Sequence, residues 1–356
     1  MSEPGPGTLT DVRDVRLGIA TDERSATGVS VVLFPKGARG AVEARGGAPG
    51  TYHTDGLGFQ GAMGMVGALF FSGGSLYGLD SARGIRRFIL DMGGGARIWG
   101  ARPPLVGISG AVIFDLPRDR ELIVDYEPLA YSACLAASAK PVPSGCVGAG
   151  RGARVGKLLG RERSMPGGQG SAAVRLPRGF TVGALGIVNA VGNVVDPSTG
   201  KVVAGTRSPS GRGWATREEV LARWTARRGP AAERGTVLVA VATDAPATRW
   251  DLHRMARAAN DAVARTVIPA HMASDGDIAF AVSTNLLVPT GRGRDREAYP
   301  GARADLLALA TEEAVVAAVT RAVAGPEGGP PKARAHRNHH NPSALAPRAQ
   351  KTNPWP

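Results

Sequence analysis

The stretch GTVLVAVATDAP, residues 235–246, opens with a Gly-Thr pair and continues as a β-branched and apolar run of strand length. Such a run predicts a buried strand over residues 236–242. The preceding residues, 197–235, are rich in Arg, Gly, Pro and Ser and predict a flexible segment with several turns. A flexible segment therefore ends in Gly235 and leads directly into a buried strand that starts with Thr236.

This junction gains a chemical meaning if the chain is cut there. Thr236 would then carry both a hydroxyl group and a free α-amine, whose ordinary pKa is about 7.7–8.0. The amine can take the hydroxyl proton near neutral pH without a histidine, which is how an N-terminal nucleophile hydrolase works. Gly235 suits self-cleavage by an N→O acyl shift, because that step needs an uncrowded carbonyl. Gly-Thr pairs that open strands are also common, so the pattern by itself leaves a purely structural role open.

The rest of the chain alternates short strands with helices, which predicts an α/β fold. Apolar runs predict further strands at residues 28–34, 67–71, 105–114, 180–191 and 277–282. Apolar residues at helical spacing predict helices at residues 75–92, 250–267 and 303–323.

Composition excludes several protein classes. The 356 residues are 43% hydrophobic and 21% charged, which is a globular composition. The 50 Gly and 26 Pro disfavour a helical bundle, and no window approaches the twenty apolar residues of a membrane span. The start, MSEPGPGTLT, lacks a basic region followed by an apolar run, and two cysteines cannot build a disulfide framework or a zinc quartet. We expect a cytoplasmic protein with neither a metal nor an organic cofactor.

The net charge of +13 is concentrated in two segments rich in Gly, Pro and Ser. Residues 197–235 hold eight Lys and Arg against three Glu, and residues 325–356 hold five against one. Basic segments can bind nucleic acid, and a non-enzymatic, nucleic-acid-associated protein is the alternative from another functional class. Aromatic residues, which stack on bases, are almost absent there, so solvated flexible segments are favoured. We expect residues 326–356 to be a disordered basic tail.

The Gly-rich segment GCVGAGRGARVGK, residues 145–157, resembles a phosphate-binding loop but fails on spacing. Arg151 stands where the loop needs its first Gly, and Leu158 follows Lys157 where a Ser or Thr should bind magnesium. The dinucleotide pattern fails as well, because Ala153 occupies its third Gly position. What remains is a segment in which the backbone can approach closely, ending in Lys157, which could equally be an ordinary surface lysine.

Two carboxylates flank one glycine in Asp275-Gly276-Asp277, just before a predicted strand. Side-chain alternation would let both carboxylates face the same side. Like charges this close raise a pKa unless a cation or hydrogen-bond donors compensate. A surface turn explains the same three residues.

Other nucleophile patterns have less support. No G-x-S-x-G motif occurs, so a Ser-His-Asp hydrolase has no local signature. His53, His253 and His271 are scattered, and each is interpreted as a hydrogen-bonded structural histidine. Ser171, in the sequence GQGS, stays as an alternative new N-terminus.

Several long stretches together resemble the DmpA-type family of N-terminal nucleophile hydrolases, also called L-aminopeptidase D-esterases or P1 peptidases. This family includes β-peptidyl aminopeptidases, pantetheine hydrolases and endo-hydrolases of nylon (6-aminohexanoate) oligomers. The matching stretches cover most of residues 9–323 in the expected order. They are GVSVVLFPKGARGAVEARGGAPGT from Gly28, SGGSLYGLDSARGI from Ser72, VGAGRGARVGKLLG from Val147, GALGIVNAVGNVVDP from Gly183, GTVLVAVATDAP from Gly235 and HMASDGDIAFAVST from His271.

The resemblance implies a four-layer αββα sandwich and a chain that cuts itself. The α chain would be residues 1–235 and the β chain residues 236–325, with the tail at 326–356 outside the resemblance. It implies hydrolysis of small linear amides or short peptides without a cofactor. It also implies that processed αβ units assemble into a homo-oligomer, commonly a tetramer.

The resemblance also assigns roles to individual residues. Thr236 is the nucleophile, and Lys157 orients and tunes its amine and hydroxyl. Asn189 donates a hydrogen bond to the tetrahedral oxyanion. Asp275 and Asp277 bind and orient the new N-terminal group, and Lys157 offsets their charge.

Three departures leave the subfamily open. Phe114 stands where some members have a Tyr assigned to the oxyanion site. A Thr nucleophile with two Asp resembles the nylon-oligomer hydrolases, whereas aminopeptidase members use Ser with a Ser/Glu pair. Gly235 occupies a position where Asn is usual in the nylon-oligomer hydrolases. The expected substrates are small linear amides or short peptides with a free amine, with 6-aminohexanoate oligomers as one candidate. An aminopeptidase or β-peptidase and a pantetheine-type amidase are the alternatives.

Overall fold

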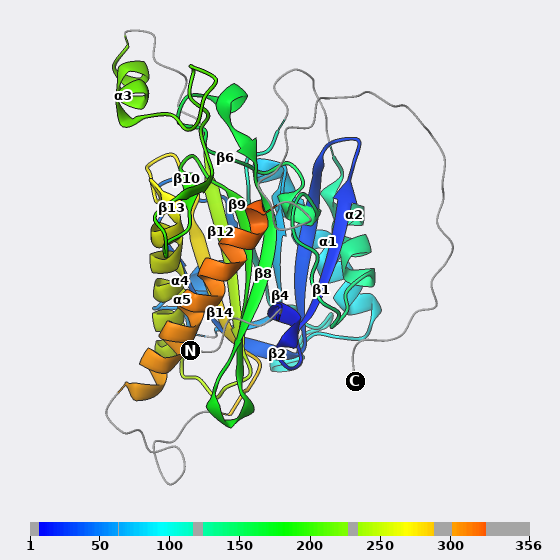
Figure 1. The fold of residues 1–356 in the computed structure, drawn as a ribbon. Coiled ribbons are helices and arrows are strands. Elements are labelled where there is room, and N and C mark those ends of the chain that lie inside the picture. The colour runs from blue at the N-terminus through cyan, green and yellow to red at the C-terminus, as the bar shows by residue number, and fades with distance from the viewer. Residues whose placement is uncertain (1–6, 63, 117–123, 227–233, 288–300, 325–356) are drawn as a thin grey trace.

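The helices and strands form a layered α/β molecule (Figure 1). The computed structural model describes residues 7–62, 64–116, 124–226, 234–287 and 301–324. The strands of the main sheet are β1 (Arg16–Asp22), β2 (Thr27–Ala44), β3 (Thr51–Tyr52), β4 (Met65–Ser72), β5 (Ile108–Val112), β8 (Gly168–Arg175), β9 (Thr181–Asn189), β12 (Thr236–Thr243) and β14 (Ile278–Ser283). The α-helices are α1 (Ser81–Asp91), α2 (Tyr126–Leu135), α3 (Arg217–Thr225), α4 (Arg249–Thr266) and α5 (Ala302–Val323). Short strands outside the main sheet are β6 (Arg154–Val155), β7 (Met165–Pro166), β10 (Asn193–Val195), β11 (Val202–Ala204) and β13 (Val267–Ile268).

Strand β2 joins the two halves of the main sheet. The strand order is β3-β5-β4-β2-β14-β12-β9-β8, and β1 pairs with β2 outside this path. The first part of β2 pairs with β1 and β4, and its last six residues pair with β14 from Arg39 to Ala44. Its register with β4 shifts between Leu33 and Ala38. One strand of 18 residues therefore belongs to both halves.

Three separate hydrophobic cores make the molecule four layers thick. One core lies between helices α4 and α5 and the half that contains β8, β9, β12 and β14. A second core lies between the two halves, where the rings of Phe71 and Phe280 are 6.0 Å apart. The third lies between β2, β4 and β5 and helices α1 and α2. The predicted αββα sandwich is thus confirmed, with α4 and α5 on one side in Figure 1 and α1 and α2 on the other.

The predicted elements around residues 235–246 are confirmed in type and close to their bounds. The strand is β12, where Val237, Val239 and Val241 contact the helix-side core and Leu238 and Ala240 the inner core. The long helices α4 and α5 match the apolar patterns at 250–267 and 303–323.

The predicted helix at 75–92 is only partly correct. The chain first forms a 3₁₀ helix, η3 (Ser75–Asp80), and α1 begins at Ser81. A Cβ on Gly78 would lie 1.9 Å from the Gly73 carbonyl oxygen, so the 3₁₀ helix packs directly against the end of β4.

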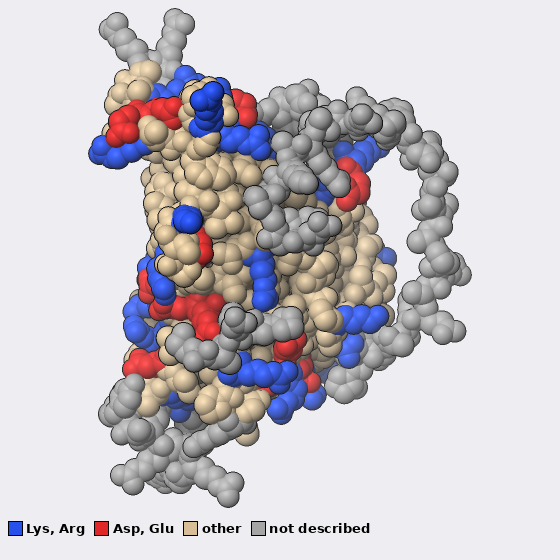
Figure 2. Space-filling model, viewed as in Figure 1, with Lys and Arg blue, Asp and Glu red and all other residues tan. Residues whose placement is uncertain are grey.

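The described part of the basic segment 197–235 carries charges of both signs. Helix α3 opens with a capping box between Thr216 and Glu219, and Glu218 adds a second acid to its first turn. Figure 2 shows blue and red side chains mixed at the α3 end of the molecule rather than one basic patch. The predicted tail at 326–356 lies outside the described residues. Among those described, no helix is long and apolar enough to cross a membrane.

Candidate active site

Strands β9 and β12 place Asn189 beside Thr236. The two residues are directly opposite in the antiparallel register, so their side chains lie on the same face of the sheet. That face is the inner one, because Ile187 and Leu238, two positions along each strand, belong to the core between the two halves. Both side chains are buried.

Lys157 is a buried lysine, so the surface-lysine interpretation is wrong. Gly156 precedes it with φ +69°, and a Cβ there would lie 2.1 Å from the carbonyl carbon of Gly205, so only glycine allows this approach. The Lys157 ammonium donates hydrogen bonds to the Asn189 carbonyl at 2.8 Å, to Asn189 Oδ1 at 3.2 Å and to the Arg234 carbonyl at 2.6 Å. The cation thus connects β9 with the chain just before Thr236.

The side-chain amide of Asn189 has a defined orientation. Its Oδ1 accepts from Lys157 and from the backbone N–H of Arg154 at 3.0 Å. Its Nδ2 donates to the carbonyl of Phe114 at 3.3 Å, which leaves a second N–H on the same nitrogen. Phe114 therefore does lie at the site, with its ring 5.8 Å from the guanidinium of Arg234.

Gly235 fits its place only because it has no side chain. A Cβ there would lie 2.5 Å from Asp275 Oδ1 and 2.6 Å from the Val191 nitrogen. The Gly235 carbonyl oxygen accepts from the Gly276 N–H at 2.9 Å and from the Thr236 hydroxyl at 2.5 Å. The hydroxyl of Thr236 is therefore in contact with the peptide group that precedes it.

The two carboxylates of the Asp-Gly-Asp sequence are buried, so the surface-turn interpretation is wrong. Asp277 Oδ1 accepts from the Val237 N–H at 2.7 Å, and Oδ2 accepts from the backbone N–H of His271 at 2.9 Å. Asp275 Oδ2 accepts from the Met272 N–H at 3.0 Å, whereas its buried Oδ1 has no hydrogen-bond partner. Burial, followed by the charge of Asp277, raises the pKa of Asp275 to about 6.

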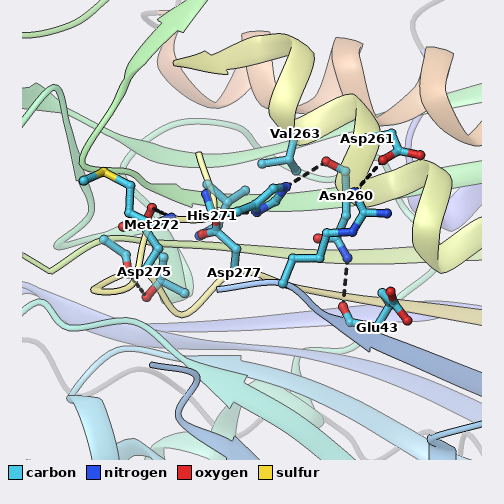
Figure 3. A network of polar contacts seen from close by, with 12 residues as sticks. Glu43, Asn260, Asp261, Val263, His271, Met272, Asp275 and Asp277 are labelled. Carbon is cyan, nitrogen blue, oxygen red and sulfur yellow. Dashed lines mark hydrogen bonds and ion pairs between the residues drawn. The ribbon is translucent and has the colours of Figure 1, made fainter. Parts of the chain in front are cut away.

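His271 belongs to this site, although the sequence indicated no role for it. Its Nδ1 lies 2.9 Å from Asp277 Oδ2, and its Nε2 lies 3.1 Å from the carbonyl oxygen of Asn260 on α4 (Figure 3). In the stretch 271–284, the sequence pattern indicated a role for the carboxylates of Asp275 and Asp277 only. A histidine six residues before a buried carboxylate, within one loop, was the available signal.

The alternative nucleophile Ser171 is placed differently. It lies within β8, and its hydroxyl accepts from the Leu9 N–H at 2.7 Å and donates to the Ala184 carbonyl at 2.8 Å. The described residues bring no buried cation or carboxylate pair to this hydroxyl comparable with those near Thr236.

A family model described as peptidase family S58 matches residues 7–328. The chain belongs to peptidase family S58. This membership agrees with the resemblance to DmpA-type enzymes, and it makes the chain an enzyme that hydrolyses amide or peptide bonds. The non-enzymatic alternative is therefore not the function of this protein.

Relatives of this S58 peptidase include proteins named as aminopeptidases and proteins named as 6-aminohexanoate-oligomer endohydrolases. A protein of Mycobacterium tuberculosis named as an uncharacterized aminopeptidase is 38% identical over 302 residues, covering 80% of this chain and 84% of its own. A 6-aminohexanoate-oligomer endohydrolase of Paenarthrobacter ureafaciens is 31% identical over 291 residues, covering 80% and 78%.

Solved structures show the same fold as this S58 peptidase. A β-aminopeptidase of Burkholderia sp. has a TM-score of 0.61 at 20% identity, covering 91% of this chain and 88% of that one. The L-aminopeptidase D-Ala-esterase/amidase of Ochrobactrum anthropi, whose structure is described as a variant of the Ntn hydrolase fold, has a TM-score of 0.61 at 21% identity, covering 89% and 86%.

The described residues of the S58 peptidase contain no cluster of metal-ligating side chains. No group of three or more His, Cys, Asp or Glu side chains among those residues is placed to hold a metal ion. Cys134 on α2 is buried, and desolvation raises the pKa of its thiol, so this cysteine is a poor nucleophile.

Proposed function

We propose that this S58 peptidase cuts its own Gly235–Thr236 bond and then hydrolyses small linear amides or short peptides with Thr236 as the nucleophile. The observation that carries the proposal is the buried Oδ1 of Asp275. It lies beside Gly235 without a hydrogen-bond partner in the uncut chain. A free α-ammonium group on Thr236 would supply both the donor and the charge that this oxygen lacks.

In the proposed processing step, Thr236 Oγ attacks the carbonyl carbon of Gly235. The C–N bond breaks, an ester forms between Gly235 and the hydroxyl oxygen, and the hydroxyl proton ends on the new amine. Water then hydrolyses the ester to a Gly235 carboxylate and a free Thr236. The Gly276 N–H already contacts the carbonyl oxygen on which negative charge develops.

In the proposed turnover, Thr236 Oγ attacks the substrate amide while its own α-amine takes the proton. The second N–H of Asn189 Nδ2 stabilises the oxyanion, and the amine passes the proton to the leaving group. Water releases the acyl group from the ester and restores the hydroxyl. Lys157 holds Asn189 and the end of the α chain in place, and Asp275 and Asp277 orient the amine.

The proposed substrates are linear, and 6-aminohexanoate oligomers are the first of them. Sequence relatives named as endohydrolases of these oligomers support this choice, as does the combination of Thr236 with two aspartates. An amino-acid amide, a β-peptide or pantetheine is the alternative substrate. The proposal includes a homo-oligomer of processed αβ units, which sedimentation of the mature protein tests.

A denaturing gel with N-terminal sequencing tests processing directly. The purified protein should give two fragments, the smaller one starting at Thr236, and the Thr236→Ala chain should remain a single band. A Thr236→Ala chain that still splits after Gly235 would overturn the proposal. Turnover of a panel of 6-aminohexanoate oligomers, amino-acid amides, β-peptides and pantetheine by the cut enzyme then identifies the substrate.

A further inference from the structure

A line of polar contacts runs from helix α4 through His271 to Asp277 (Figure 3). It continues to the backbone N–H of Val237, the residue after Thr236. The Asn260 carbonyl lies 3.1 Å from His271 Nε2, and His271 Nδ1 lies 2.9 Å from Asp277 Oδ2. The other oxygen of Asp277 accepts from the Val237 N–H at 2.7 Å. Asn260 is itself fixed, because its Nδ2 donates to the Glu43 carbonyl at 2.8 Å.

The ring of His271 faces a hydrogen-bond acceptor at each nitrogen. A backbone carbonyl cannot donate, and Asp277 already accepts two backbone N–H groups. A neutral imidazole has a single N–H, so it would leave one nitrogen lone pair against an acceptor. Against an Asp277 carboxylate, only the imidazolium, with a proton on both nitrogens, satisfies both contacts.

We propose that His271 is a positioning residue of the reaction, which as an imidazolium holds the side chain of Asp277 aimed at the Val237 N–H. This inference rests on the proposed function of Thr236. The Val237 N–H belongs to the residue next to the nucleophile, so its contact with Asp277 fixes the start of β12 and hence the direction of the Thr236 amine and hydroxyl.

The charges around the ring agree with this assignment. Burial alone lowers the pKa of His271, but the hydrogen bond and charge of Asp277 outweigh it, and the pKa is raised above its ordinary value. The positive charge of His271 in turn lowers the pKa of Asp275, against the larger effect of burial. The charged side chains of this network come from the same loop, from the end of β2 and from α4, and they are Asp275, Asp277, Glu43, Arg45, Arg257 and Asp261. Arg45 opposes the protonation of His271, and its guanidinium is paired with Asp261 at 2.6 Å.

The backbone at His271 supports a specific role. His271 has φ +57°, the left-handed region that non-glycine residues rarely adopt. In this conformation its backbone N–H and its ring Nδ1 both reach Asp277 Oδ2. The unfavourable conformation therefore allows two contacts from His271, one from its backbone N–H and one from its ring, to the same carboxylate oxygen.

The protonation state can be measured without any catalysis. Ring ¹⁵N shifts in the uncut Thr236→Ala chain, assigned by the loss of one signal in His271→Asn, should show both nitrogens of His271 protonated at pH 6.5. The titration midpoint should lie above 6.5 and fall when Asp277→Asn is added. A neutral ring at pH 6.5 would overturn the proposal, whether or not the chain can cut itself.

The catalytic consequence is tested with a matched pair of variants. Asn tolerates the left-handed conformation, so His271→Asn removes the ring without new backbone strain, and His53→Asn is the control because His53 has φ +51° outside the site. In His271→Asn we expect kcat to fall about tenfold or more, since a charge-assisted contact is lost. The acid limb of the pH profile should move to higher pH, because the carboxylate pair loses a nearby cation. A lower kcat with an unmoved acid limb would show a merely structural role.

Discussion

The buried carboxyl of Asp275 should destabilise the uncut chain at neutral pH. Its pKa is raised from 3.8 to about 6 in the folded chain, chiefly by burial. Relative to the ionised carboxylate, the neutral carboxyl stabilises the folded chain, and this stabilisation is fully present below pH 3.8. It is lost as the pH rises towards 6, where the buried group ionises. At 1.36 kcal/mol per pH unit, this difference amounts to about 3 kcal/mol above pH 6.

Asp275→Asn, which cannot ionise, should remove this penalty. In the Thr236→Ala background, which keeps the chain uncut, we expect the free energy of unfolding to rise by about 3 kcal/mol at pH 7.5 and to change little at pH 4. Urea unfolding followed by tryptophan fluorescence at both pH values measures the difference. Asp80→Asn, at an exposed carboxylate, is the control and should have a small effect at both. An equal effect of Asp275→Asn at pH 4 and pH 7.5 would refute the idea of a buried, uncompensated charge.

Three further changes test the geometry around the cut. Gly235→Ala should slow processing strongly, because its Cβ would meet Asp275 and the Val191 nitrogen, whereas Gly186→Ala on β9, where the nearest atom is 3.8 Å away, should process normally on a gel time course. Lys157→Met should lower the rates of processing and turnover by about a hundredfold, because three acceptors, two of them buried on Asn189, lose a charged donor. Normal rates on the gel and in the amide assay would remove Lys157 from the site. Asn189→Ala should lower kcat by about a hundred- to a thousandfold in enzyme that has been cut, and an unchanged kcat would mean that another group binds the oxyanion.

The helices and strands that carry the site could be predicted, because each is determined by a short run of neighbouring residues. The β-branched run after Thr236 and the apolar stripes of α4 and α5 each determine one element and one buried face. By contrast, β2 was predicted only over residues 28–34. The continuation of β2 into the second half of the sheet depends on its pairing with β14, which lies more than 200 residues further along the chain.

The burial of the charged site residues could not be read from local sequence. Lys157 is buried because its acceptors come from Asn189 and Arg234, which are distant in the chain. His271 was missed because its role depends on a left-handed turn that brings its ring back to Asp277 and on the carbonyl of Asn260 from a neighbouring helix. In both cases the tertiary contact, and not the residue type, distinguishes a functional group from an ordinary one.

The central place of β12 has a consequence for how activity arises. This strand is bonded to β9 on one side and to β14 on the other, and β14 is bonded in turn to β2. Two separately translated chains would have to interleave their strands. Under self-cleavage the free N-terminal threonine forms only after the precursor has folded. Slow maturation, rather than a weakened mature enzyme, should therefore be the first symptom of a folding defect anywhere in the two layers of strands.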